Sequence, residues 1–248
     1  MIRFIIICII LFGFLILSIP VLIIEWIIGK YNPHFKDTSS LAIVNCAFRL
    51  ILLVSGVKLT VLGEENVPKD CPVLYIANHR SYFDILLTYT RVPRPTGYIA
   101  KAEMLRYPLL SHWMKYLHCQ FLDRKDLKKG MQTILASIEL IKRGISICIF
   151  PEGTRNERDD EMLPFHEGSF KIAQKTNCPI IPMAITNSGE IFENHLPFIK
   201  PCPVILEYGS PIYPDQLSKE NKKFMGAYCQ NIMKEMLEKN KNLLDISE

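Results

Sequence analysis

The stretch that decides the fold is Ile145-Ser146-Ile147-Cys148-Ile149-Phe150-Pro151-Glu152-Gly153-Thr154-Arg155. Its first six residues form an apolar run rich in β-branched side chains, which predicts a buried strand over residues 145–150. Pro151 and Gly153 then predict a tight turn, because proline fixes one backbone angle and glycine permits another. A strand that ends in a charged turn predicts a ligand-binding edge, where α/β sheets hold their ligands.

Helices and further strands alternate on both sides of this stretch. Residues 126–143 have apolar side chains at helical spacing and are followed by Gly144, so they are predicted to form a helix. The stripe on that helix consists of Leu127, Met131, Ile134, Leu135, Ile138 and Ile141. Other helices are predicted over residues 82–90, 168–176 and about 217–238, the last with a stripe at Phe224, Tyr228, Ile232 and Met236. Further strands are predicted over residues 58–62, 73–77, 98–100, 119–122, 180–185 and 204–208.

This alternation predicts an α/β fold with a mostly parallel central sheet flanked by helices. The 248 residues suffice for one well-cored domain and an appendage, and the apolar excess is concentrated at the N-terminus. Residues 4–24 carry no charge, and a helix of that length spans ~31 Å, about the thickness of a bilayer core. A cleaved signal peptide is the alternative, but no small-x-small cleavage site follows the run. Pro20 is expected to kink this helix.

A second apolar stretch, residues 41–54, is shorter and is interrupted by Asn45 and Arg49. We expect it to lie in the membrane interface, with an ordinary core helix as the alternative. The sequence therefore predicts two regions, a membrane anchor with an interfacial helix over residues 1–56 and an α/β domain over residues 57–248. The eight cysteines lack disulfide-framework or zinc-site spacing and suit a reducing compartment. The net charge of +4 is mild, which favours lipid or phosphate partners over nucleic acid.

Three groups of polar residues follow three different predicted strands. His79 follows residues 73–77, Arg124 follows residues 119–122, and Glu152 with Arg155 follows residues 145–150. If these strands are parallel, their carboxyl ends lie at the same edge of the sheet, so the three groups converge.

The first group lies in Asn78-His79-Arg80-Ser81-Tyr82-Phe83-Asp84. Ser81 is a natural helix N-cap, and Asp84 in the first turn is able to reach back to His79. A carboxylate on one ring nitrogen leaves the other nitrogen as a proton acceptor, which predicts a general base. In the alternative, Asp84 only caps the helix. The sequence lacks a G-x-S-x-G elbow, so the base is expected to act on a hydroxyl of the substrate.

The second and third groups supply cations. Arg155 in the turn is able to form two hydrogen bonds with a phosphate, and Glu152 is expected to orient that arginine or a substrate hydroxyl. Arg124 is a second candidate, and Lys101 is expected along the same edge. The alternatives are an ordinary charged turn and a solvated loop. Residues 159–161 are read as a solvated acidic loop, and no metal site is predicted.

In combination, these blocks resemble the membrane-bound glycerolipid acyltransferases, most closely the bacterial type of 1-acylglycerol-3-phosphate acyltransferases. The resemblance covers residues 58–211 and rests on four ordered blocks, namely residues 78–84, Phe121-Leu122-Asp123-Arg124, residues 150–155 and Ile181-Pro182-Met183-Ala184-Ile185. One block departs from the pattern, since His166 and Glu167 follow Phe165 where many relatives have a basic residue.

The resemblance implies that His79 is the general base and Asp84 its orienting partner. The hydroxyl of lysophosphatidic acid would attack the thioester of an acyl-CoA or acyl carrier protein, without a covalent acyl-enzyme, and give phosphatidic acid for phospholipid biosynthesis. The substrate-binding residues that it implies are Arg124, Glu152, Gly153, Thr154, Arg155 and Pro182, and Lys101 is added to them because it is expected along the same edge. It implies no cofactor beyond the acyl thioester.

Three alternatives remain open at this point: an acyltransferase with another acceptor, such as glycerol-3-phosphate or another lysophospholipid, a non-catalytic protein that binds anionic lipid, and a lipid hydrolase. The expected location is a bacterial cell membrane. Arg3 precedes the anchor, whereas Lys30 and Lys36 follow it. This small excess of positive charge after the anchor favours a domain on the cytoplasmic side.

Overall fold

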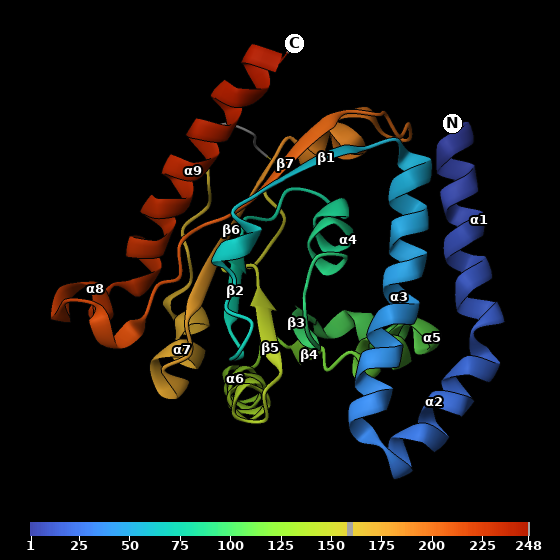
Figure 1. Ribbon diagram of the computed structural model, residues 1–248, viewed down its shortest axis with the longest axis horizontal. Helices are drawn as coiled ribbons and strands as arrows, with labels where there is room; N and C mark the ends of the chain where they lie inside the picture. The colour runs from blue at the N-terminus through green and yellow to red at the C-terminus, as the bar shows by residue number, and fades with distance from the viewer. Residues whose placement is uncertain (158–160, 248) are drawn as a thin grey trace.

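A seven-stranded sheet forms the centre of the protein in the computed structural model, which describes residues 1–157 and 161–247 (Figure 1). Its strands are β1 (Lys58–Leu62), β2 (Leu74–Ala77), β3 (Thr96–Lys101), β4 (Gln120–Leu122), β5 (Ser146–Ile149), β6 (Ile180–Thr186) and β7 (Pro203–Tyr208). They lie in the order β1-β7-β6-β2-β5-β3-β4. Neighbouring strands are parallel except for β6 and β7, which pair antiparallel. The predicted α/β fold with a mostly parallel sheet is therefore confirmed.

The strands that carry the candidate site are parallel neighbours. β2 pairs parallel with β5, β5 with β3, and β3 with β4. The carboxyl ends of β2, β4 and β5 therefore lie at the same edge of the sheet, as the convergence of their polar residues required. Because β4 is the outermost strand, residues that follow it lie at the margin of that edge.

Helices cover both faces of the sheet. Alternate residues of β2 point to opposite faces, with Tyr75 and Ala77 in one apolar cluster and Leu74 and Ile76 in the other. One face packs against α4 (Phe83–Tyr89), α5 (Pro108–Tyr116) and the N-terminal helices, and the other packs against α6 (Leu127–Lys142), α7 (Lys171–Thr176) and α9 (Met225–Ser247) (Figure 1). The short helices are η1 (Glu64–Asn66), η2 (Ala102–Arg106), η3 (Glu167–Phe170), η4 (Ser188–Ile191), η5 (Glu193–His195), η6 (Pro214–Gln216) and α8 (Lys219–Lys223).

The N-terminal region is a helical hairpin. α1 (Ile2–Leu17) and α2 (Ile19–Tyr31) meet at a bend of 49°, and α3 (Pro33–Ser55) runs back alongside them (Figure 1). The bend follows from Pro20, which lies in the first turn of α2, so the predicted single helix is divided there. α3 extends beyond the predicted residues 41–54. Among the described residues it is the one unbent helix long and apolar enough to cross a membrane, and α1 with α2 passes the same criterion as a bent pair.

Polar contacts hold this hairpin against the domain. The indole Nε1 of Trp113 donates to the hydroxyl of Ser18 at the bend over 2.9 Å. The hydroxyl of Tyr116 donates to the carbonyl oxygen of Leu22 in α2 over 3.0 Å. α3 ends at Ser55 and is capped by Gly56, and β1 begins two residues after this cap. The division into residues 1–56 and 57–248 stays a prediction.

Two predicted helical stripes differ from the buried faces. Leu127 is 91% exposed, and Met131 and Leu135 are exposed with it, because α6 turns Ile138 and Ile141 toward the sheet. The predicted helix over residues 217–238 is divided at Phe224, whose backbone leaves the helical region. The buried face of α9 contains Met225, Cys229 and Met233 together with the predicted Met236, whereas Phe224 is 51% exposed and Tyr228 and Ile232 are partly buried.

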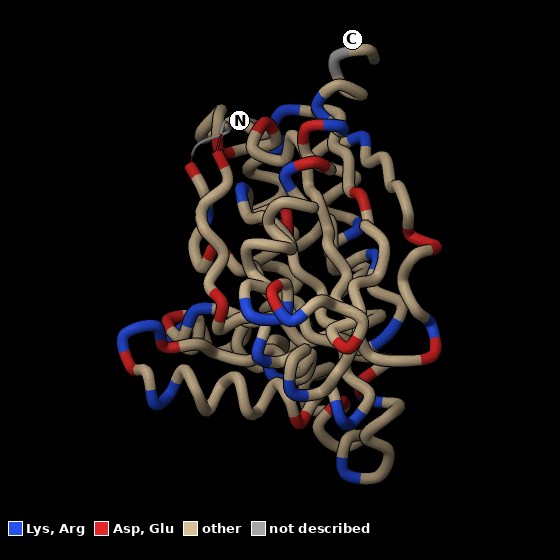
Figure 2. The backbone as a smooth tube through the Cα atoms, turned by 90° about the vertical axis from the view of Figure 1, so that its left-hand side faces the viewer, with Lys and Arg blue, Asp and Glu red and all other residues tan. Residues whose placement is uncertain are grey.

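Charged residues are distributed over the whole chain. Figure 2 shows Lys and Arg interspersed with Asp and Glu along the backbone in this view, rather than gathered on one element. Groups of three or more His, Cys, Asp or Glu side chains arranged to hold a metal ion are absent from the described part of the chain. Asp159 and Asp160 of the predicted acidic loop lie outside the described residues.

Candidate active site

His79 and Asp84 form a hydrogen-bonded pair between the end of β2 and the first turn of α4. Nδ1 of His79 donates to Oδ2 of Asp84 over 2.9 Å, and Asp84 is completely buried. The same oxygen accepts the main-chain N–H groups of Arg80 and Ser81, each over 2.7 Å. Because a carboxylate only accepts hydrogen bonds, this contact keeps the proton on Nδ1 and leaves Nε2 as the acceptor nitrogen.

The start of α4 explains how Asp84 reaches the imidazole. The hydroxyl of Ser81 accepts the N–H of Phe83 over 3.0 Å, while Asp84 reaches back to the N–H of Ser81. The exchange resembles a capping box, although α4 begins at Phe83 and its N-cap position is Tyr82 rather than Ser81. Capping and histidine orientation are therefore not alternatives, because the one carboxylate does both.

The neighbouring strands fix the loop that carries His79. Its ring stacks on the ring of Phe150, with the centroids 4.1 Å apart. The side-chain amide of Asn78 donates to the carbonyl oxygen of Ile185 over 2.9 Å and accepts the N–H of the same residue over 2.8 Å. Sequence reasoning did not assign these roles to Phe150 and Asn78. Their direct adjacency to the predicted site residues was the available signal.

Glu152 braces the main chain of the site. Its Oε1 accepts the N–H of His79, and its Oε2 accepts the N–H of Leu163, both over 2.9 Å. Burial raises the pKa of Glu152, and these two hydrogen bonds oppose that effect. Both carboxylate oxygens thus bind main-chain groups rather than Arg155. Gly153 has a φ of +76°, and a Cβ at this position would meet the ring of His166 at 3.0 Å, so the turn requires glycine.

Arg155 lies beside the start of α4. Its guanidinium carbon is 3.7 Å from the centroid of the Tyr82 ring, and the guanidinium donates to the hydroxyl of Tyr82 over 3.0 Å. Glu193 accepts from Arg155 over 3.4 Å and from the N–H of Tyr82 over 2.7 Å. Stacking and hydrogen bonds therefore position the cation near the His79 loop. Sequence reasoning missed Tyr82 and Glu193 as its partners.

The other predicted residues are more widely spread. Lys101 ends β3 and Arg124 follows β4, and both side chains are exposed at the margin of the sheet edge. Partial burial lowers the pKa of Arg124, and nearby Glu103 opposes this effect. Thr154 is exposed in the turn, whereas Pro182 is buried in β6, where its carbonyl oxygen accepts the N–H of Gly209 over 2.8 Å.

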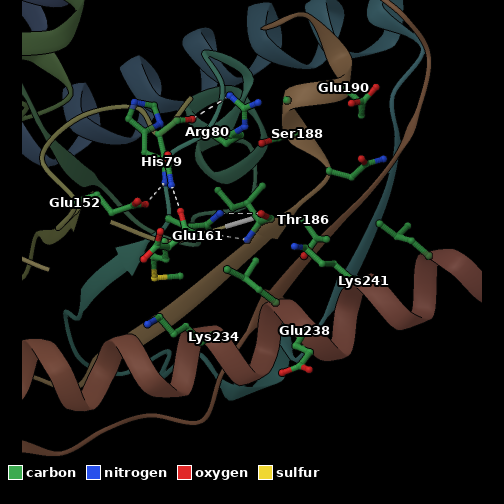
Figure 3. A pocket seen from close by; sticks show the side chains of 18 residues that line it. His79, Arg80, Glu152, Glu161, Thr186, Ser188, Glu190, Lys234, Glu238 and Lys241 are labelled. Atoms are coloured by element: carbon green, nitrogen blue, oxygen red, sulfur yellow. Dashed lines mark hydrogen bonds between the residues drawn. The ribbon is translucent and has the colours of Figure 1, made fainter. Parts of the chain in front are cut away.

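A cavity of about 840 Å³ opens at this edge of the sheet, between α9 and the carboxyl end of β6 (Figure 3). His79 and Glu152 line it, together with Asn78 and Arg80 from the same loop. Lys101, Arg124, Arg155 and Pro182 are not among the described residues that form its wall. The predicted phosphate-binding arginines therefore lie outside the described wall of the cavity that His79 lines.

Comparison with known proteins gives one family. Residues 58–186, slightly more than half of the chain, match the family model described as Acyltransferase. A 1-acyl-sn-glycerol-3-phosphate acyltransferase of Cocos nucifera is 32% identical over 69% of this chain and 55% of its own length. The Saccharomyces cerevisiae protein of the same name is 29% identical over 78% of this chain and 63% of its own length. The chain thus spans between half and two thirds of the length of these relatives.

A solved structure shares the fold. The crystal structure of the 1-acyl-sn-glycerophosphate (LPA) acyltransferase PlsC from Thermotoga maritima matches with a TM-score of 0.77. The match covers 96% of this chain and 97% of that chain at 23% identity, so it bears on the fold alone. The family match includes both β2 with the His79 loop and β5 with its turn. On this evidence the chain belongs to the acyltransferase family.

Proposed function

We propose that this protein transfers a fatty acyl group from an acyl thioester to the free hydroxyl of 1-acylglycerol-3-phosphate and releases phosphatidic acid and a thiol. The observation that carries the proposal is the 2.9 Å contact between Nδ1 of His79 and the buried carboxylate of Asp84. A cation, Arg155, is held next to the same loop. The relatives named above are 1-acyl-sn-glycerol-3-phosphate acyltransferases, which supports the choice of acceptor.

The chemistry is a direct displacement. Nε2 of His79 takes the proton of the acceptor hydroxyl as its oxygen attacks the thioester carbonyl carbon, and Asp84 stabilises the imidazolium that forms. The carbon–sulfur bond then breaks, and the departing thiolate takes the proton from the imidazolium. A thiol nucleophile is disfavoured at Cys119, where burial raises the pKa to about 12. The proposed reaction has no covalent acyl-enzyme and needs no cofactor besides the acyl-CoA or acyl carrier protein donor.

Arg155 is the proposed main contact for the acceptor phosphate. A guanidinium forms two parallel hydrogen bonds with a phosphate, and stacking on Tyr82 holds this one in place beforehand. The phosphate would replace the long 3.4 Å contact with Glu193. Arg124 and Lys101 are proposed to add positive charge along the same edge. Glu152 contributes indirectly, because it fixes the main chain of His79.

The hairpin gives the reaction a location. Its outward side chains are large and apolar, with Ile2, Ile9, Phe12 and Ile16 exposed on α1. We propose that the hairpin binds the protein to a bacterial cell membrane with the domain on the cytoplasmic side. Acceptor and product both carry acyl chains, so a site at the membrane surface keeps those chains out of water.

The test is product formation with competing acceptors. Purified protein in detergent micelles receives one acyl-CoA and equal amounts of lysophosphatidic acid, glycerol-3-phosphate and monoacylglycerol. We expect phosphatidic acid to form fastest. Preference for monoacylglycerol, which lacks the phosphate, would contradict the proposed phosphate contact, and thiol release without any acceptor would indicate a hydrolase.

A further inference from the structure

The cavity beside His79 has a wall that the proposed mechanism does not use. One face of α9 forms this wall, with Lys234, Leu237, Glu238, Lys241 and Leu244 along it (Figure 3). An adjacent face of the same helix is buried against the sheet through Met225, Cys229 and Met233. At about 840 Å³ the cavity lies in the size range of sites for drug-sized ligands and cofactors.

The wall opposite α9 contains polar groups without partners. The side chains of Thr186 and Ser188 are 4% and 1% exposed, and neither hydroxyl has a hydrogen-bond partner within the described part of the chain. Buried hydroxyls are usually paired, so two unpaired ones in the wall of one cavity indicate a polar ligand. They are neutral groups, which suit amides and hydroxyls better than a phosphate.

We propose that this cavity binds the phosphopantetheine arm of the acyl donor. The inference rests on the proposed acyl transfer and names the place of its second substrate. Acyl-CoA and acyl carrier protein both present the acyl group on this arm, whose two amides and one hydroxyl match the groups of Thr186 and Ser188. The phosphate at its far end matches the ammonium groups of Lys234 and Lys241 on α9. Its thioester end then reaches His79, which lies in the same cavity wall.

The arrangement of the layers supports this assignment. α9 covers one face of the sheet, whereas α4 and the hairpin cover the other (Figure 1). Arg155, the proposed phosphate contact of the lipid acceptor, is held at the start of α4 and does not line the cavity. A direct displacement needs both substrates bound at once. With the donor on the α9 side and the lipid on the α4 side, both meet at His79 without competing for space.

The charges of the cavity limit where the phosphate lies. Glu238 lies between Lys234 and Lys241 along α9, and Glu190 projects from η4 (Figure 3). Among the described residues, Lys234 forms no ion pair. On η4 the carboxylate of Glu190 disfavours a phosphate near the β6 end, whereas on α9 two lysines flank the single carboxylate of Glu238, so the phosphate is assigned to the α9 side. The wall thus distinguishes the two ends of the arm.

Equilibrium binding of a non-hydrolysable donor tests the inference. The probe is an S-alkyl-CoA thioether, added without acceptor to the full chain in micelles. The variants are Lys234→Glu with Lys241→Glu, which reverses the charge, and Leu237→Trp, which fills the cavity. Lys219→Glu on α8 is the matched charge control. We expect each test variant to bind the probe on the order of tenfold more weakly, because the lysine variant loses charge-assisted hydrogen bonds and the tryptophan variant leaves less room for the arm. The control should bind the probe like wild type. Far-UV circular dichroism verifies the fold of each variant.

Three probes separate the sources of the phosphate. S-alkyl-CoA and an S-alkyl carrier protein share the phosphopantetheine arm, and S-alkyl-pantetheine lacks the phosphate. If the Lys234→Glu with Lys241→Glu variant binds S-alkyl-CoA and the S-alkyl carrier protein more weakly than wild type does, but binds S-alkyl-pantetheine equally well, the assignment of the lysines to the phosphate of the arm is supported. If the same variant weakens binding of S-alkyl-CoA alone, the cavity is still the donor site, but the lysines are assigned to the nucleotide part of CoA. Unchanged binding of all three probes to Leu237→Trp, or loss of lysophosphatidic acid binding instead, would overturn the inference. Because no acceptor is present, failure of the proposed acyl transfer would leave this result intact.

Discussion

Glu152 holds His79 by its main chain rather than by its ring, since Oε1 of Glu152 accepts the N–H of His79 over 2.9 Å. The N–H of Asn156, from the same turn, donates to the carbonyl oxygen of His79 over 2.7 Å. The turn after β5 and the loop after β2 are therefore one structural unit. Glu152 therefore acts as a support for the main chain of His79 rather than as a substrate contact.

A Glu152→Gln substitution tests this brace. The amide keeps one acceptor oxygen but turns an NH₂ group toward a main-chain N–H, so we expect a loss of about 1–3 kcal/mol in the free energy of unfolding. Burial raises the pKa of Glu152 above its ordinary value of 4.5, so the folded state binds this proton more tightly than the unfolded state does. Wild type should gain stability over Glu152→Gln as the pH falls through the raised pKa toward 4.5, and lose that gain as the pH rises. Denaturant unfolding at several pH values measures the difference in unfolding free energy between wild type and Glu152→Gln. If this difference became smaller as the pH falls, the pKa of Glu152 would not be raised in the folded state.

Asp84→Asn tests the orientation of the imidazole. An amide at this position still accepts the N–H groups of Arg80 and Ser81 through its oxygen, but it no longer stabilises an imidazolium. We expect kcat to fall by about 10²–10⁴ with little change in KM for the donor. Asp215→Asn, at an exposed position in η6, is the control and should retain full activity. Steady-state kinetics with both substrates varied decides the matter, and an unchanged kcat would mean that Asp84 only caps α4.

Arg155→Lys tests the phosphate contact. Lysine keeps the charge but loses the planar fork and the stacking on Tyr82, so we expect KM for lysophosphatidic acid to rise about tenfold. Monoacylglycerol, which has no phosphate, should be used by wild type and variant at equal rates. Arg143→Lys at the end of α6 serves as the control. An equal effect on both acceptors would show that Arg155 supports the loop rather than the substrate.

Trp113→Phe tests how the hairpin is attached to the domain. The substitution removes the 2.9 Å hydrogen bond to Ser18 and keeps most of the apolar contact with Phe14. We expect a loss of about 1 kcal/mol in stability, with catalysis retained in micelles. Thermal unfolding of Trp113→Phe, Ser18→Ala and the double variant forms a cycle. Strictly additive losses would show that the two side chains do not interact.

The fold and much of the site could be predicted because they depend on local patterns. Seven apolar runs became the seven strands, and the loop with His79 and Asp84 was recognisable from a cap and a histidine close together in sequence. What the sequence concealed depends on contacts between distant segments. Glu152 binds the main chain of His79, and Glu193 binds Arg155 across 38 residues, so neither pairing leaves a local signal. The exposed position of Leu127 was equally hidden, because helical spacing gives a stripe but not the neighbour it faces.

The most direct measurement of the central claim is phosphatidic acid formation by His79→Ala, with wild type and His112→Ala measured in the same micelles. If Nε2 of His79 removes the proton of the acceptor hydroxyl, the rate should fall by at least about 10² while lysophosphatidic acid and the donor analogue still bind. His112→Ala, on the exposed side of α5, should behave like wild type. Phosphatidic acid formation by His79→Ala at the wild-type rate would contradict the account.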